Sequence, residues 1–141
     1  MLTNLIYVSI RTPECSDTDI QNILKSSNKN NVSLDVTGVL LYTSNRFIQF
    51  LEGPYDQVTQ LYHNIKTDPR HKNVILLSLQ KDVSDKRIFP KWAMGGKGFG
   101  ETDIEFDSDL STEERKEFVN LINGHTGNAQ TMVNAIKKVF K

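Results

Sequence analysis

Short apolar segments alternate with amphipathic segments along this chain, and their order constrains the fold more than any other feature. Strand-like runs rich in branched residues occupy 4–10, 35–43, 46–53 and 74–80. Between them, 16–31 and 54–67 carry apolar residues at helical spacing. The order is β-α-β-β-α-β, and 88–96 can supply a fifth strand. The sequence therefore predicts an α+β, ferredoxin-like fold with a sheet and two helices on one of its faces.

Local signals mark where these elements begin and end. Ser16 and Asp19 have the spacing of a capping box at the first helix. The residues "SN" at 44–45 can form a hairpin turn, and Pro54 suits a helix N-terminus. The glycine-rich segment 95–100 indicates a hinge.

Two further amphipathic helices are predicted at 111–124 and 128–140. Their apolar stripes contain Phe118, Leu121 and Ile122 in the first, and Met132, Val133, Ile136 and Phe140 in the second. Short helices are marginal alone and must pack on something. They either cover the sheet face opposite the first two helices or carry an interface. We expect a core domain over 1–97 and a hinge with a helical appendage over 98–141.

Composition excludes several classes of protein. The 141 residues carry 17 basic and 17 acidic side chains, which gives no electrostatic basis for binding nucleic acid or an anionic membrane. Cys15 is the single cysteine, so no internal disulfide is possible. No apolar run approaches the roughly 20 residues that span a bilayer, and the N-terminus lacks a basic signal-peptide region. We therefore expect a cytoplasmic protein.

The sequence gives little support for a metal site or for nucleophilic catalysis. The three histidines, with one cysteine and no close-spaced ligand pair, do not predict a metal site. No nucleophile has a recognisable base and orienting group, so the sequence indicates no enzyme.

The stretch "FIQFLEG" at 47–53 raises a specific question, because it places an amide among core residues. Strand alternation puts Gln49 on the same face as Phe47 and Leu51. A buried amide without partners costs roughly 1–3 kcal/mol. Gln49 is bonded either to neighbouring backbone or to something polar. Tyr7, in the middle of the first strand, poses the same question with a phenol.

A pair of asparagines ends the first predicted helix. Asn30 and Asn31 are either C-cap residues or functional amides.

Together these segments resemble the BLUF family of flavin-binding blue-light sensors. The similarity runs through "YVS" (7–9), "NN" with "VTGVLLY" (30–42), "FIQFLEGP" (47–54), "DPRH" (68–71) and "FPKWAM" (89–94). Two departures are mild: Asp35 stands where a glycine is frequent, and Val36 where isoleucine is.

The resemblance implies a flavin between the two helices, FAD first, with FMN and riboflavin as alternatives. It assigns Ile23 and Ile65 to the flavin faces, Asn31 to the C4=O and N3–H edge, and Asn30 to a contact near C2=O. Gln49 would lie between the flavin and the Tyr7 hydroxyl. The other cofactor-binding residues implied are Ser27, Phe47, Asn64, Asp68, Arg70 and His71.

The resemblance also implies a mechanism. Light would drive electron and proton transfer from Tyr7, relayed through Gln49, and leave a red-shifted signalling state. Trp92 and Met94 match the pair that transmits the signal. We expect a short-type member of this family without a fused effector domain, so output would pass to an unknown downstream protein or to a homo-oligomer, a dimer or larger. The alternatives are a small flavoenzyme or an acylphosphatase-like hydrolase on the same fold, and a structural adaptor without a chromophore. A hydrolase of this kind would need an arginine in a glycine-rich loop after the first strand; Arg11 is nearby, but "TPECSD" supplies no glycine.

Overall fold

The computed structural model describes residues 1–89, 95–98, 110–125 and 127–139. Its strands are β1 (Leu2–Arg11), β2 (Thr37–Tyr42), β3 (Arg46–Gly53), β4 (His71–Ser84) and β5 (Gly95–Gly98). Its helices are α1 (Asp17–Leu34), α2 (Tyr55–Lys66), α3 (Thr112–Ile122) and α4 (Ala129–Val139). The sheet order is β4-β1-β3-β2-β5, antiparallel throughout except for the β2–β5 pair. The predicted ferredoxin-like α+β fold is confirmed.

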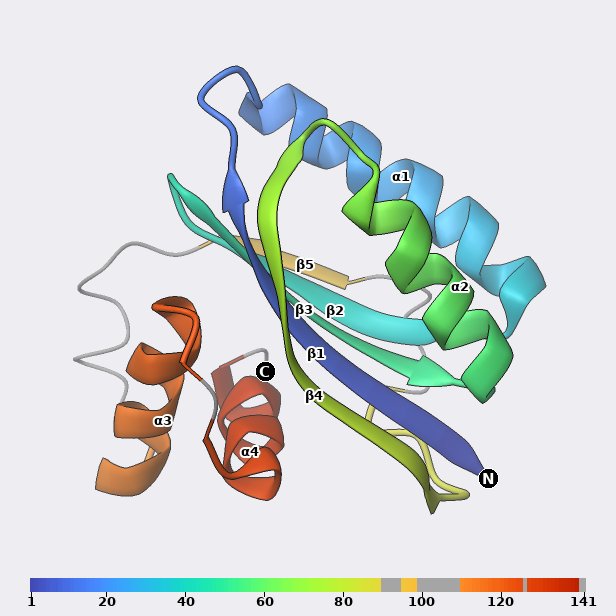
Figure 1. Ribbon diagram of the computed structural model, residues 1–141, viewed down its shortest axis with the longest axis vertical. Coiled ribbons are helices and arrows are strands. Elements are labelled where there is room, and N and C mark those ends of the chain that lie inside the picture. Colours follow the sequence, from blue (N-terminus) through green and yellow to red (C-terminus); the bar gives the residue numbers. More distant parts are fainter. Residues whose placement is uncertain (90–94, 99–109, 126, 140–141) are drawn as a thin grey trace.

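Helices cover both faces of the sheet. Figure 1 shows α1 and α2 on one face and α3 and α4 on the other. The α1/α2 face buries Leu5, Tyr7, Ile20, Leu40, Phe47 and Leu51. The opposite face buries Ile6, Val39, Ile48, Phe50, Phe118, Leu121, Met132 and Ile136. Of the two roles left open for the C-terminal helices, covering the sheet is therefore the one this packing supports.

The ends of α1 follow from its sequence. Ser16 Oγ accepts the Asp19 N–H at 3.1 Å, and the Asp19 carboxylate accepts the Ser16 N–H at 2.9 Å, which is the predicted capping box. The C-terminus differs from one expectation. The helix continues to Leu34 and is capped by Asp35, whose φ of 57° lies in the left-handed region. Asn30 and Asn31 are thus helical residues, and the C-cap interpretation is wrong.

The fifth strand lies later than predicted. Gly95–Gly98 pairs in parallel with β2, while residues 88–89 are not strand and 90–94 lie outside the described residues. A Cβ at Gly96 would lie 2.4 Å from Leu24 Cδ1, and one at Gly98 would lie 2.6 Å from Tyr42 Cε2. Gly96 thus allows close packing under α1, and Gly98 allows it against Tyr42 of β2. Because 95–98 form a paired strand, the hinge expected from residue 95 onward is wrong for these residues.

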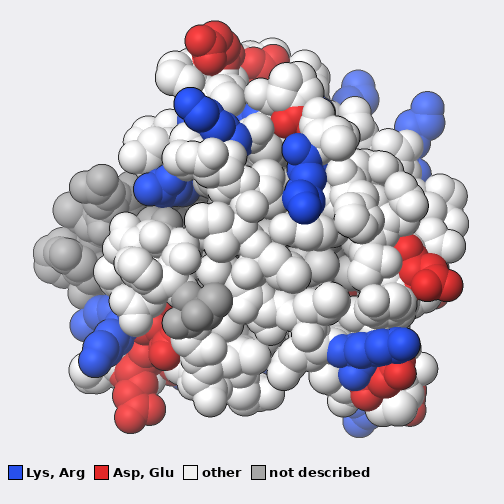
Figure 2. Space-filling model, viewed as in Figure 1, with Lys and Arg blue, Asp and Glu red and all other residues white. Residues whose placement is uncertain are grey.

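β4 forms one edge of the sheet and faces the viewer in Figures 1 and 2. Figure 2 shows a largely uncharged centre on this face, with charged side chains towards its rim. The exposed apolar residues of β4 include Ile75, Leu76, Leu79 and Val83. Pairing with β1 is interrupted by register shifts, and Asn73 and Asp82 adopt positive φ. Such irregularities disfavour the addition of another strand.

None of the helices within the described residues is long and apolar enough to cross a lipid bilayer.

Candidate functional site

Tyr7 and Gln49 form the centre of the site. They are direct partners in the β1–β3 register, and both side chains point to the α1/α2 face. Tyr7 is fully buried and Gln49 is 4% exposed. The Tyr7 hydroxyl donates a hydrogen bond to Gln49 Oε1. The sequence placed both groups in the core; the structure adds that they bond to each other.

The environment keeps the Tyr7 phenol protonated. Burial is the main reason that its pKa is raised well above the ordinary value, and the nearby Asp68 and Tyr62 raise it further. The Tyr62 ring lies 5.8 Å from the Tyr7 ring, centroid to centroid. Tyr7 is therefore a neutral proton donor whose acceptor is already in place.

A cavity of about 190 Å³ opens beside this pair, between α1 and α2. It is lined by Ile23, Ser26, Ser27, Asn30, Asn31, Leu40, Gln49, Leu61, Asn64, Ile65, Asp68, Arg70 and His71. Its volume is below the roughly 300–1,000 Å³ of sites that enclose a whole ligand. A cavity of this size suits one ring system, with the rest of a larger molecule outside.

The lining combines apolar walls with convergent polar groups. α1 contributes Ile23 and α2 contributes Ile65, so two aliphatic side chains come from the two helices. Asn31 is 1% exposed, whereas Asn30 and Asn64 lie at the exposed rim. Amides that both donate and accept match a planar heterocycle with alternating C=O and N–H groups. The chemistry of this set fits a flavin ring.

His71 closes the end of the cavity near Tyr7. Its Nδ1 lies 2.8 Å from Ser9 Oγ, and its ring centroid lies 4.7 Å from that of Phe47 and 6.0 Å from that of Tyr7. Phe47 does not line the cavity but lies buried behind His71. The resemblance implied that Phe47 is a cofactor-binding residue; the structure places its ring against that of His71.

Asp68 and Arg70 form an ion pair at the mouth of the cavity. Arg70 Nη2 lies 2.6 Å from Asp68 Oδ2, and Arg70 Nε donates to Asp68 Oδ1 at 3.0 Å. The hydrogen bond from the Arg70 side chain is the largest cause that lowers the pKa of Asp68. The pair fixes both side chains, so the guanidinium is held where the α2–β4 connection meets the cavity.

A pH dependence follows from the burial of His71. Desolvation lowers its pKa from 6.5 to about 4, so the folded state prefers the neutral ring. Above pH 6.5 the His71 ring is neutral in both the folded and the unfolded state, so its burial costs no stability. As the pH falls from 6.5 towards 4, the unfolded state binds protons before the folded state does, and the folded state loses stability. We expect a loss of roughly 2 kcal/mol between pH 7 and 4.5. Urea unfolding at both pH values tests this, with His71→Gln as the variant that should lose this component.

Some site residues were missed from the sequence. Ser9, Ser26, Leu40 and Leu61 are part of the site or its support. Ser9 could have been found, because it lies two positions after Tyr7 on one strand and so shares its face. Trp92 and Met94 lie outside the described residues.

Comparison with known proteins agrees with this geometry. The sequence model of the BLUF family, described as "Sensors of blue-light using FAD", matches residues 2–95 of this chain. The chain is 40% identical over 93 residues to photoactivated adenylate cyclase subunit beta of Euglena longa, covering 66% of this chain and 11% of that protein. It is 39% identical over 94 residues to the blue light- and temperature-regulated antirepressor BluF of Escherichia coli (strain K12), covering 67% of this chain and 23% of that protein.

Solved structures resemble nearly the whole chain. The photo-activated state of BlsA has a TM-score of 0.75 at 25% identity and covers 99% of this chain and 95% of that one. The dark state of BlrB, a BLUF protein, has a TM-score of 0.73 at 25% identity and covers 98% and 96%. The fold and the family match define a flavin-binding blue-light sensor. The chain belongs to the BLUF family.

Proposed function

We propose that this chain uses Tyr7 and Gln49 as a light-driven hydrogen-bond switch and passes the resulting state to a protein partner or to further copies of itself. The bond from the buried Tyr7 hydroxyl to Gln49 Oε1, beside a cavity that suits a flavin ring, is the observation that carries the proposal. Blue-light absorption by the flavin would supply a strong oxidant next to the phenol.

The protein side of the reaction follows from this bond. A phenol that loses an electron becomes a strong acid, and Gln49 Oε1 is the acceptor already in place. When the electron returns, the proton returns as well, and the Gln49 amide is left rotated or tautomerised. An amide suits this role because its two ends exchange donor for acceptor at nearly constant shape. With Oε1 on the Tyr7 side before illumination, rotation or tautomerisation changes the group that the amide presents to the ligand, and this change in hydrogen bonding would account for a red-shifted spectrum.

Cofactor identity is part of the proposal. We propose FAD, with FMN and riboflavin as alternatives, held by the cavity residues and by Asn31 at the C4=O and N3–H edge of the ring. Arg70 at the cavity mouth suits the polar chain of a nucleotide.

Replacing Asn31 with alanine should weaken flavin binding, because the buried polar edge of the ring loses a two-point partner. The expected cost is roughly 1–3 kcal/mol, or about 5- to 150-fold in Kd. Flavin fluorescence titration of the apoprotein measures it. Asn22→Ala, an exposed asparagine on the same helix, is the matched control. Equal affinities for the parent and Asn31→Ala would contradict the assigned role.

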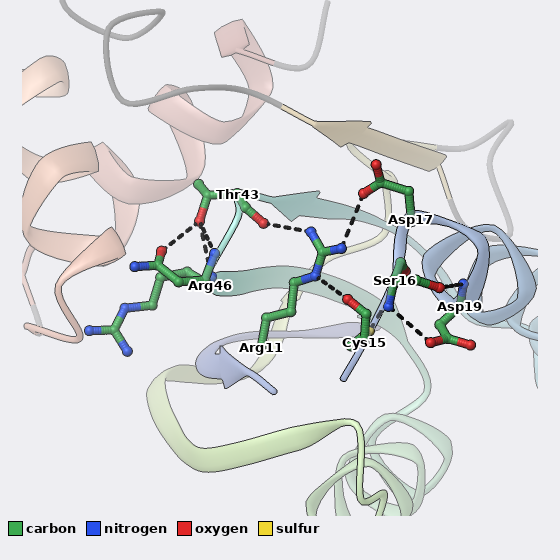
Figure 3. Close-up of polar contacts among 8 residues, drawn as sticks. Arg11, Cys15, Ser16, Asp17, Asp19, Thr43 and Arg46 are labelled. Atoms are coloured by element: carbon green, nitrogen blue, oxygen red, sulfur yellow. Dashed lines mark hydrogen bonds and ion pairs between the residues drawn. The ribbon is translucent and has the colours of Figure 1, made fainter. Parts of the chain in front are cut away.

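The hydrolase alternative depends on Arg11, and the surroundings of Arg11 argue against it. Figure 3 shows its guanidinium between β1, the end of β2 and the start of α1. It donates to the Cys15 carbonyl at 3.0 Å, to the Thr43 carbonyl at 2.9 Å and to the Asp17 carboxylate at 3.1 Å. The side chain is only 9% exposed. An arginine held by three protein acceptors has a structural role, not the anion-binding role that a hydrolase would need. We therefore favour a sensor over an enzyme.

Output would leave through the C-terminal half of the chain. We propose that Trp92 and Met94 transmit the change at Gln49, and that α3 and α4 present it to an unidentified downstream protein or in a dimer or larger assembly. A cytoplasmic location is consistent with Cys15, which is a buried free thiol.

A further inference from the structure

Arg87 binds three segments of the fold that meet at one end of the sheet. Its Nη1 donates to Thr37 Oγ1 at 2.9 Å and to the Glu52 carbonyl at 3.1 Å. Its Nη2 donates to the Asp35 carbonyl at 2.7 Å and lies 3.0 Å from the Asp35 carboxylate. The guanidinium therefore joins the end of α1, the start of β2 and the end of β3.

The carboxylate of Glu52 holds the residues that follow Arg87. It is 3% exposed and accepts the N–H of Ile88 at 2.9 Å and that of Phe89 at 2.7 Å. Thr37 Oγ1 adds a longer contact of 3.3 Å. A buried carboxylate is tolerated only when such donors surround it. We call Asp35, Thr37, Glu52 and Arg87 the Arg87 clamp.

One side of the Arg87 clamp leads to the flavin cavity. Asn31 lines the cavity, and its carbonyl accepts the N–H of Val36 at 3.1 Å and also that of Asp35. Asp35 is the left-handed cap that ends α1, where the family often has glycine. A residue other than glycine at positive φ usually pays some strain. Here its carboxylate and carbonyl both bind Arg87, which a glycine could do only through its carbonyl.

The other side leads to the face beneath α3 and α4. Phe89 is 6% exposed, and its ring centroid lies 5.7 Å from that of Phe50, edge to face. Phe89 belongs to the same buried cluster as Phe118 of α3 and Ile136 of α4. Glu52 lies three residues after Gln49 on β3, so the two side chains point to opposite faces of the sheet. The flavin face and the α3/α4 face are thus connected through a single strand.

We propose that Arg87 is a positioning residue that couples the flavin site to the α3/α4 face, through light-dependent loosening of the hydrogen bonds that Glu52 accepts from Ile88 and Phe89. This inference rests on the proposed photocycle. It assigns to Asp35 a role specific to chains that carry an acid at this position. The segment tied down by the Arg87 clamp leads directly into the residues that contain Trp92 and Met94.

Amide hydrogen exchange on the full-length flavin-bound protein, measured by NMR in the dark and under blue light, tests the proposal. In the parent, the amides of Ile88 and Phe89 should exchange about tenfold faster in the light. Arg87→Met removes the guanidinium at similar length; these amides should then exchange fast already in the dark, and the light-dependent difference should disappear. The red shift of the flavin should persist, since Arg87 does not line the cavity.

Two further variants keep the test decisive if Arg87→Met folds poorly. Asp35→Asn tolerates the left-handed conformation and removes only the ion pair, so it should reduce the light-dependent difference. Lys25→Met, an exposed lysine of α1, should leave it unchanged. A parent with a red shift but no light-dependent exchange at these amides would overturn the proposal, as would variants that keep the full difference. Absence of any red shift would instead overturn the proposed function, and the coupling with it.

Discussion

Replacing Tyr7 with phenylalanine should abolish the red-shifted state while leaving flavin bound. The ring still fills the core, but the group that would lose an electron and a proton is gone, and Gln49 loses the hydroxyl that donates to its Oε1. The loss should be complete, because the mechanism depends on that single donor. Light-minus-dark absorption spectra of the flavin-bound variant measure it.

Tyr62→Phe is the matched control for this experiment. Its ring lies 5.8 Å from the Tyr7 ring, so a tyrosine hydroxyl is removed from the same neighbourhood without touching the bond to Gln49. This variant should keep the red shift. A normal difference spectrum in Tyr7→Phe would show that the assigned electron and proton donor is wrong.

Replacing Phe118 with alanine should have the largest effect on stability. Phe118 is fully buried in α3 and belongs to the apolar cluster between the sheet and the C-terminal helices. Truncating a buried phenylalanine costs about 3–5 kcal/mol, through lost burial and the cavity left behind. The free energy of unfolding in urea should fall by that amount.

Val119 provides the comparison on the same helix. It is 43% exposed, so Val119→Ala should change the free energy of unfolding by no more than about 0.5 kcal/mol. If Phe118→Ala proved as mild as Val119→Ala, α3 would not be an integral cover of the sheet, and the helical appendage expected from the sequence would be the better description.

Much of the fold could be predicted because its signals are local. The strand "RFIQFLEG" was predicted with the bounds that the structure has, since a turn pair precedes it and a proline follows it. The capping box of Ser16 and Asp19 was predicted from spacing alone. Alternation also placed Gln49 on an inner face.

The errors arose where tertiary contacts decide the outcome. β5 consists of three glycines and a lysine, which have little strand propensity, and it forms because β2 offers an edge under α1. The end of α1 was misjudged because Asp35 takes the left-handed conformation that asparagine or glycine usually supplies.

In the candidate site, too, sequence patterns predicted some residues and tertiary contacts determined the others. Family motifs pointed to most of the residues that line the cavity, but they also include Phe47, which lies beside His71 and is not part of the lining. Ser9 ends the motif "YVS" but was not assigned to the site, and Leu61 belongs to no motif used; the register of β1 and the direction of α2 bring them to the site. In the Arg87 clamp, Arg87 contacts residues that lie 35 or more positions away in sequence, which no local pattern reveals.

The absorption spectrum of the purified parent protein, reconstituted with FAD and recorded before, during and after blue light, tests the central claim most directly. The account predicts a bound flavin whose spectrum shifts to the red under illumination and returns fully in the dark, because Gln49 changes its hydrogen bonds while no covalent bond is made. A protein that binds flavin but bleaches under illumination, or shows no shift, would contradict the switch formed by Tyr7 and Gln49.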